Sequence, residues 1–248
     1  MPILAANWKM YKTIAEAQAW LDAVADRPAL ERAEVVVFPP LTTLHALRGR
    51  CQRLGLGAQD VGWAEQGAFT GMVSAAQLRD AGCGYALVAH SERRRYACED
   101  DQAAARKIAA LWQAGLTPVY CVGEDAAERE AGLGEARLQT QVETVLTALS
   151  NELGGRLVIA YEPVWAIGSG APATPAQASD AAALIRKTVL SRCGAAASAR
   201  LSLLYGGSTS PETVRGFMAE PLIDGLLVGS ASLDPNSFLA MLEVMVDA

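Results

Sequence analysis

The chain has 248 residues, 51% of them hydrophobic and 19% charged, a composition that excludes an intrinsically disordered protein. Asp and Glu number 27 against 21 Lys and Arg, and the resulting formal net charge of -6 argues against nucleic acid as the main partner. No apolar run approaches the ~20 residues that a membrane-spanning helix needs, so no membrane partner is expected.

The cysteines and the first residues bear on the cellular compartment. Five cysteines are scattered along the chain without a Cys-x-x-Cys pair, which fits reduced thiols better than disulfides or a zinc site. The segment 1–7 has neither the basic start nor the cleavage pattern of an export signal. We therefore expect an unexported, cytoplasmic protein.

Short apolar runs bounded by turn residues recur along the chain, and we expect each of them to form a strand. The runs are continuous rather than alternating, which is typical of parallel strands buried on both faces. The expected strands are 3–6, 34–38, 56–59, 85–89, 118–122, 157–161, 201–205 and 225–228.

Segments with helical spacing follow these runs. Thr13 and Ser74 are candidate N-caps, and prolines precede or open several of the other segments. The expected helices are 14–25, 41–54, 75–81, 103–114, 139–153, 176–192, a helix that opens at 210–212, and 237–246.

The alternation of strand and helix predicts an α/β protein. Eight units in 248 residues give about 31 residues each, the size of one βα step, and the total is the usual length of an eightfold (β/α) barrel. A doubly wound open sheet is the alternative, but no Gly-x-Gly-x-x-Gly turn follows the first strand. We expect residues 1–248 to form a single barrel domain.

Polar residues directly after the expected strands are the candidates for chemistry, because the C-terminal ends of barrel strands hold the reactive groups of this architecture. Asn7 and Lys9 follow the first strand. His90 follows the fourth strand and Glu162 the sixth. A lone histidine is more often structural than catalytic, and most lysines are solvated surface charges. Their convergence with a carboxylate favours an active site, in which burial can raise the pKa of Glu162 and a cation can stabilise an oxyanion.

Small residues follow the seventh and eighth strands, at 206–208 and 229–232. They let backbone amides approach a phosphate group closely, and these two loops form the usual phosphate site of an eightfold barrel. The segment 163–175, after Glu162, is apolar in its middle with prolines and small residues at its ends. This composition indicates a lid that closes over a ligand.

Several longer strings, in the same order along nearly the whole chain, resemble those of the triosephosphate isomerase family. They are Asn7–Met10, Gly67–Gly71, His90–Arg94, Cys121–Glu124, Tyr161–Gly168 and Tyr205–Ser208. The resemblance implies a TIM barrel that interconverts dihydroxyacetone phosphate and D-glyceraldehyde 3-phosphate through an enediolate, in glycolysis and gluconeogenesis. It also implies that neither a metal nor a cofactor takes part.

The resemblance implies a role for each matching catalytic residue. Glu162 would remove the proton next to the carbonyl and return it to the neighbouring carbon, while a neutral His90 would polarise the carbonyl; the family is itself a standard example of this pairing. Lys9, oriented by Asn7, would supply positive charge to the enediolate and to the phosphate.

The remaining implied roles concern binding and support. The substrate would contact Asn7, Lys9, Gly168, Ser169, Ser208, Gly229 and Ser230. The supporting residues would be Ser91, Glu92, Cys121 and Glu124, with Ser91 resting against Glu162 while the lid is open.

The family resemblance also implies a homodimer, formed through the loop from Gln59 to Met72, with Thr70 entering the neighbouring subunit's site. Met72 stands where the family usually has a glutamate that pairs with Arg93 of the partner subunit. We therefore expect Arg93 to pair with Glu99 of its own chain and the dimer to be held less tightly.

Other positions depart from the common family pattern without removing a catalytic group. Asp60 replaces a usual asparagine, Ala89 a usual glycine and Ser230 the second glycine of a phosphate loop. Ala171 and Pro172 replace a usual Lys-Thr pair, and because proline fixes its own φ we expect a stiffer trailing hinge of the lid.

Two other functions are compatible with the barrel. One is an isomerase or lyase that acts on another phosphorylated sugar, although the catalytic set and the short lid favour a three-carbon substrate. The other is a barrel that has lost its activity and serves as an interaction protein, against which the intact set of Lys9, His90 and Glu162 argues.

Overall fold

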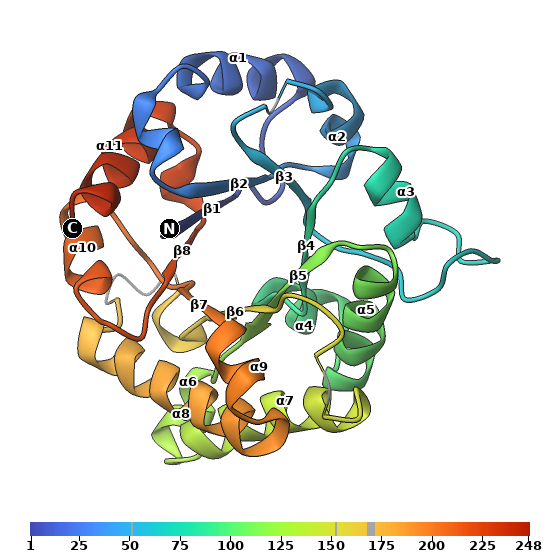
Figure 1. The fold of residues 1–248 in the computed structure, drawn as a ribbon, viewed down its shortest axis with the longest axis vertical. Coiled ribbons are helices and arrows are strands. Elements are labelled where there is room, and N and C mark those ends of the chain that lie inside the picture. Colours follow the sequence, from blue (N-terminus) through green and yellow to red (C-terminus); the bar gives the residue numbers. More distant parts are fainter. Residues whose placement is uncertain (51, 152, 168–171) are drawn as a thin grey trace.

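The computed structural model describes residues 1–50, 52–151, 153–167 and 172–248. Within them, parallel strands form a closed barrel in which each strand pairs with the next in the sequence and the last pairs with the first (Figure 1). The strands are β1 (Ile3–Asn7), β2 (Glu34–Phe38), β3 (Gly55–Ala58), β4 (Tyr85–Val88), β5 (Thr117–Val122), β6 (Val158–Tyr161), β7 (Ser202–Tyr205) and β8 (Gly225–Val228).

Helices cover the outside of the barrel (Figure 1). They are α1 (Ile14–Val24), α2 (Leu41–Leu47), α3 (Ala75–Asp80), α4 (Ser91–Ala97), α5 (Asp101–Gln113), α6 (Ala126–Glu130), α7 (Gly134–Ala148), α8 (Pro175–Cys193), α9 (Ala195–Arg200), α10 (Pro211–Met218) and α11 (Pro235–Val246). Short 3-10 turns are η1 (Pro28–Glu31), η2 (Val164–Ala166) and η3 (Ser230–Ser232). The predicted TIM barrel is confirmed, and the expected strands match the observed ones to within one residue at each end.

Two expected helices have the wrong bounds, in each case because the backbone leaves the helical region early. The helix expected over 41–54 stops at Leu47, since Arg48 has left the helical region (ψ 128°) and Gly49 has a φ of 77°. The helix expected over 139–153 begins at Gly134 and ends at Ala148, ahead of two left-handed residues, Ser150 and Asn151.

Some short helices had no counterpart in the expected elements. Helix α6 has only five residues, and a capping box between Asp125 and Glu128 fixes its start. Helix α9 lies in the alanine-rich segment after Gly194. Such short helices bury too few residues to give a clear apolar period.

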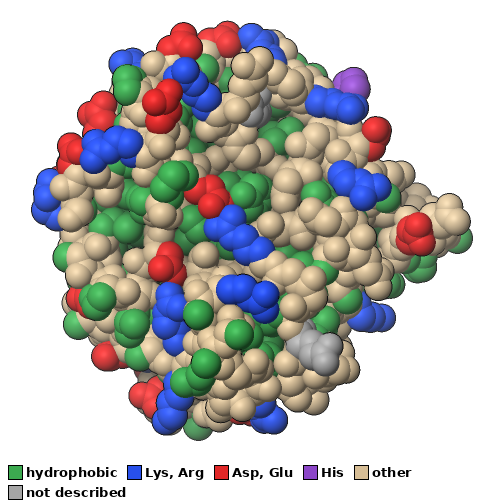
Figure 2. All heavy atoms as spheres, in the orientation of Figure 1, with side chains coloured by type: hydrophobic (Ala, Val, Ile, Leu, Met, Phe, Trp, Pro, Cys, Tyr) green, Lys and Arg blue, Asp and Glu red, His purple; other side chains and the backbone are tan. Residues whose placement is uncertain are grey.

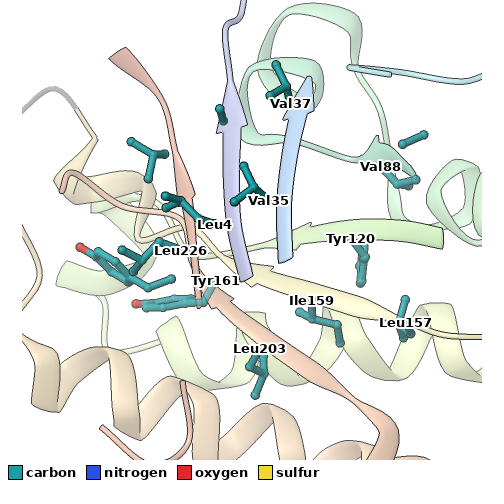
Figure 3. Packing of buried hydrophobic residues seen from close by; sticks show 14 of the residues in the cluster. Leu4, Val35, Val37, Val88, Tyr120, Leu157, Ile159, Tyr161, Leu203 and Leu226 are labelled. Atoms are coloured by element: carbon teal, nitrogen blue, oxygen red, sulfur yellow. The ribbon is translucent and has the colours of Figure 1, made fainter. Parts of the chain in front are cut away.

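Two apolar layers account for the high hydrophobic content. Alternate strand residues such as Ile3 and Ala5 fill the inside of the barrel, whereas Leu4 and Ala6 pack outward with the helices. Figure 3 shows labelled residues of the outer layer along several strands. Strands buried on both faces require the continuous apolar runs seen in the sequence. Among the described residues, no helix is long and apolar enough to cross a membrane.

Glu34 at the start of β2 binds both Tyr85 at the start of β4 and Arg156 in the segment before β6. The Glu34 carboxylate accepts both guanidinium N–H groups of Arg156 at 2.8 Å and the Tyr85 hydroxyl at 2.7 Å. Burial works to raise the pKa of Glu34, but the bonds from Arg156 and Tyr85 outweigh it and lower that pKa. Burial and the contact with the Glu34 carboxylate raise the pKa of Tyr85 to about 12, although Arg156 acts in the opposite direction.

Replacing Glu34 by glutamine should therefore lower the free energy of unfolding at pH 7 by about 1 kcal/mol, since Arg156 is partly solvated. A carboxylate whose pKa is lowered by folding stabilises the protein above its unfolded pKa, and this stabilisation is lost as the pH falls through the folded pKa. Urea unfolding at pH 7 and pH 3 should show the difference between wild type and Glu34→Gln shrinking at the lower pH. A difference independent of pH would contradict the assignment.

Candidate active site

The residues expected at the strand ends line one cavity of about 440 Å³ at the C-terminal end of the barrel. Asn7 and Lys9 reach it from the end of β1, His90 from β4 and Glu162 from β6. The loops after β7 and β8 complete its wall, with 206–209 and 229–231. Four side chains from distant parts of the sequence are thus brought together beside two loops of small residues.

The carboxylate of Glu162 contacts the imidazole of His90 directly. Nε2 of His90 lies 2.9 Å from Oε1 of Glu162, and the backbone N–H of Ser91 donates to Oε2 at 2.8 Å. His90 is 6% exposed and Glu162 is 2% exposed. The contact between Ser91 and Glu162 that the family resemblance implies is therefore present.

The imidazole of His90 has a defined arrangement of donors and acceptors. The backbone N–H of Glu92 donates to Nδ1 at 3.2 Å, so Nδ1 carries a lone pair and Nε2 carries the proton of the neutral ring. His90 also caps the N-terminus of α4, whose partial positive charge favours the neutral ring. Burial opposes protonation too, but the adjacent Glu162 carboxylate outweighs it and raises the pKa of His90 while the two side chains are in contact.

The expectation that burial would raise the pKa of Glu162 is wrong for this arrangement. Burial is the largest influence and acts in that direction, but His90 and the Ser91 N–H together outweigh it and lower the pKa. The carboxylate is therefore held ionised, and it becomes a stronger base only when it leaves these donors.

Lys9 is fixed through its backbone as well as its side chain. It adopts a left-handed φ of 51°, and its N–H donates to Oδ1 of Asn7 at 3.0 Å. Its Nζ contacts Oε1 of Glu92 at 2.7 Å. The amide of Gln59 donates to the Lys9 carbonyl at 2.8 Å, a supporting contact that the sequence analysis missed because glutamine at the start of a loop has no distinctive pattern.

The backbone of Glu162 is held by its neighbour strand. Its N–H donates to the Val122 carbonyl at 2.7 Å, and a Cβ on Gly123 would lie 1.7 Å from the Glu162 carbonyl oxygen. The buried Gln141 side chain accepts the Gly123 N–H at 2.9 Å and donates to its carbonyl at 3.2 Å. Only glycine fits at position 123, and the sequence analysis did not identify Gln141 as its support.

The loops after β7 and β8 have the compactness expected of a phosphate site. A Cβ on Gly207 would lie 2.2 Å from the Tyr205 hydroxyl oxygen, and Gly229 precedes the 3-10 turn η3. The first amides of such a turn have no carbonyl partner within it. Ser208 and Ser230 are exposed and line the cavity.

The leading end of the expected lid is anchored by Glu124. Its Oε1 accepts the indole N–H of Trp165 at 2.7 Å and the hydroxyl of Tyr161 at 3.0 Å, and the Arg129 guanidinium lies 3.9 Å from the Trp165 ring centroid. Pro172 is exposed. The expected phosphate contacts Gly168 and Ser169, and the hinge residue Ala171, lie outside the described residues.

Cys121 lies inside the barrel rather than in the cavity wall. Its side chain belongs to the inner apolar layer, and burial raises the pKa of its thiol. Its carbonyl accepts an N–H of Arg94 at 3.1 Å. Cys121 can therefore support the site only through packing and backbone position.

The loop from Gln59 to Met72 projects beyond the ring of helices, between β3 and α3 (Figures 1 and 2). Thr70 is exposed at this projection, and Phe69 and Met72 are 41% and 46% exposed. Arg93, beside the base of the loop, contacts Oδ2 of Asp60 at 2.7 Å. The expected pair with Glu99 is present but longer, at 3.5 Å.

Another cavity, of about 660 Å³, adjoins the first and lies beside this loop. Lys9 and His90 line both cavities, and Trp63 and Met72 of the loop line the larger one. Among the described residues, no group of His, Cys, Asp or Glu side chains is placed to hold a metal ion.

A carboxylate, an imidazole and an ammonium group that meet at the C-terminal end of a (β/α)8 barrel, beside two compact loops, define a barrel enzyme with acid–base chemistry. The comparisons specify the family. The family model for triosephosphate isomerase matches residues 2–245.

Curated relatives agree with that match. Triosephosphate isomerases of Symbiobacterium thermophilum and Pelobacter propionicus are each 46% identical, over 100% and 97% of this chain and 98% and 97% of their own. The triosephosphate isomerase of Solibacter usitatus is 44% identical over 97% of this chain and 98% of its own. The chain belongs to the triosephosphate isomerase family.

Proposed function

We propose that the chain catalyses the reversible interconversion of dihydroxyacetone phosphate and D-glyceraldehyde 3-phosphate in glycolysis and gluconeogenesis. It is an isomerase of the aldose–ketose type, as its family membership over the whole chain indicates. The observation that carries the proposal is the contact of His90 Nε2 with Glu162 Oε1 in a cavity that Lys9 also lines.

In the proposed reaction, Glu162 takes the proton from the carbon next to the carbonyl of dihydroxyacetone phosphate. The electrons of that C–H bond form the enediolate, while the Nε2 proton of His90 is aimed at the carbonyl oxygen. Glu162 then returns its proton to the former carbonyl carbon, and a proton moves between the two oxygens through His90. To reach the carbon, Glu162 must leave Ser91 and His90, which removes the contacts that lower its pKa.

The proposed substrate contacts follow from charge and from the compact loops. Lys9, oriented by Asn7, faces the negative charge of the enediolate and of the phosphate, and its present partner Glu92 must release Nζ. The backbone amides at Ser208, Gly229 and Ser230, with Gly168 and Ser169 of the lid, bind the phosphate. Neither metal nor cofactor has a role in these steps.

A coupled assay of the purified chain with glyceraldehyde 3-phosphate tests this function. Formation of dihydroxyacetone phosphate is expected, with little conversion of longer sugar phosphates. Turnover of only another sugar phosphate would replace the proposed substrate, and absence of all turnover would favour a barrel that serves as an interaction protein.

We also propose that residues 1–248 form one domain in the cytoplasm and that two copies associate through the Gln59–Met72 loop. The exposed Phe69, Thr70 and Met72 at the projection, and the adjoining cavity of about 660 Å³, support the dimer. Arg93 pairs with Asp60 of its own chain, and the exposed apolar side chain of Met72 fits an interface held by apolar contact.

Substituting Thr70 by arginine should separate the subunits, because a long cation would have to enter the neighbouring site without a partner. Analytical ultracentrifugation should give about twice the chain mass of 26.1 kDa for the wild type and the chain mass for Thr70→Arg. Leu190→Arg, at a similarly exposed position on α8, is the control and should remain dimeric. A wild-type monomer, or a dimer that survives Thr70→Arg, would refute the proposed interface.

A further inference from the structure

Ala89 occupies an unusual backbone conformation directly before His90. It lies between the end of β4 at Val88 and the start of α4 at Ser91, and it has a φ of 57°. This left-handed region is unfavourable for residues with a Cβ, and a non-glycine residue stays there only when its surroundings hold it. Ala89 is 1% exposed, so protein groups rather than water must do so.

Two charged side chains bind the two peptide groups of Ala89. The Glu99 carboxylate accepts its N–H through Oε1 at 2.9 Å, and Nε of Arg94 donates to its carbonyl oxygen at 3.0 Å. Hydrogen bonds to charged groups are about twice as strong as those between neutral groups. The conformation that precedes His90 is therefore held from both sides.

Each of these charges is itself fixed by further partners. The second oxygen of Glu99 contacts Nζ of Lys107 at 2.7 Å, and these two side chains are 3% and 4% exposed. Arg94 contacts Oδ1 of Asp101 at 2.6 Å and donates to the carbonyl of Cys121 at 3.1 Å. Neither Glu99 nor Arg94 lines the smaller cavity, where the substrate is proposed to bind, although Glu99 lines the larger one beside it.

We propose that Glu99 and Arg94 are positioning residues for His90, holding Ala89 in its left-handed conformation and thereby aiming Nε2 of the imidazole at the reacting oxygen. The direction of the ring depends on this backbone, because Nδ1 of His90 is aligned with the Glu92 N–H of the same turn. The proposal rests on the proposed function of His90. It is specific to a chain with alanine at position 89, since glycine enters the left-handed region without strain.

Glutamine at position 99 is the informative substitution. A carboxylate accepts from both Ala89 N–H and Lys107 Nζ, whereas an amide has one oxygen and must turn its NH₂ group toward one of these donors. We expect Glu99→Gln to lower kcat about tenfold, because misaimed catalytic groups lose rate. KM should change by less than about twofold, because phosphate binding does not involve this turn.

A second substitution that removes the backbone strain at position 89 distinguishes a positioning role of Glu99 from a general effect on stability. If Glu99 acts by holding strained alanine, combining Glu99→Gln with Ala89→Gly should restore kcat to within about threefold of Ala89→Gly alone. A control at the opposite end of the barrel is Asp224→Asn, where a single oxygen, Oδ2 of Asp224, accepts the backbone N–H of Leu203 at 2.7 Å and an N–H of Arg186 at 2.6 Å. It should lower Tm without lowering kcat.

Imidazole ¹⁵N resonances provide a readout that does not depend on activity. The chain has two histidines, so labelled protein gives a signal from His90 and an internal reference from the exposed His45. Glu99→Gln should shift or broaden the His90 signals, leave those of His45 unchanged, and lose this effect when Ala89→Gly is added.

Two results would overturn the positioning role. One is an unchanged kcat and unchanged His90 signals in Glu99→Gln. The other is an equal loss of kcat with and without Ala89→Gly, which would reduce Glu99 to a structural partner of Lys107. If the wild type shows no isomerase activity, the proposed function fails, while the ¹⁵N signals still test whether Glu99 orients His90.

Discussion

Replacing Glu162 by glutamine is expected to lower kcat about 10³-fold while leaving phosphate affinity nearly unchanged. The amide keeps the volume of the carboxylate but cannot take a proton at neutral pH. Phosphate affinity should persist because the proposed contacts are backbone amides and Lys9. Steady-state kinetics, with the inhibition constant of inorganic phosphate, measures the two effects separately.

Glu34→Gln is the control for Glu162→Gln, because it removes a carboxylate at the opposite end of the barrel and should leave kcat unchanged. The neutral amide at position 162 must also turn either its oxygen or its NH₂ group toward His90, so a small change in stability is expected. Parallel losses of kcat and phosphate affinity would contradict the separation of a proton-transfer group from phosphate-binding groups.

Substituting Gly123 by alanine should have the largest structural effect of any single methyl group near the site. The new Cβ would lie 1.7 Å from the Glu162 carbonyl oxygen, so the backbone at Glu162 has to move. We expect a loss of about 3 kcal/mol in the free energy of unfolding, at the upper end for overpacking. A displacement of the base by about 1 Å should also lower kcat about 10²-fold.

Gly84→Ala is the matched control. Gly84 also lies next to a barrel strand, but a Cβ there meets no heavy atom within 4 Å and its φ is not in the left-handed region. Urea unfolding and kcat of Gly84→Ala should stay close to wild type. If Gly123→Ala were as stable and active as the wild type, the prediction would be wrong, because the backbone after β5 and β6 could then shift without displacing the Glu162 carboxylate.

The barrel can be predicted from the sequence because its strand–helix unit is short and is repeated along the chain. A strand buried on both faces must be continuously apolar, so runs such as 34–38 and 225–228 are evident and their observed bounds are the expected ones. Helix ends are less predictable, because they depend on single residues. Arg48 ends α2 by leaving the helical region, although arginine is a good helix former.

The candidate site could be predicted where polar residues follow the ends of apolar strands, as at Lys9, His90 and Glu162. Supporting residues such as Gln59, Gln141 and Glu99 could not, because they bind backbone groups of other segments and have no pattern of their own. Nothing in the sequence indicates that Gln59 binds the carbonyl of Lys9 or that Glu99 binds the N–H of Ala89. The direction of the Glu162 pKa also depends on contacts that only the folded chain creates.

The pairing of the last strand with the first has a consequence for the timing of folding. Lys9 comes from the beginning of the chain, whereas Gly229, whose position lies beside the Lys9 side chain, follows β8 near its end. The cation and this loop can meet only when β8 has joined β1, a contact between the most distant parts of the sequence and therefore late and entropically costly to form. A chain still emerging from the ribosome thus has no complete site, and activity during refolding would report closure of the whole barrel.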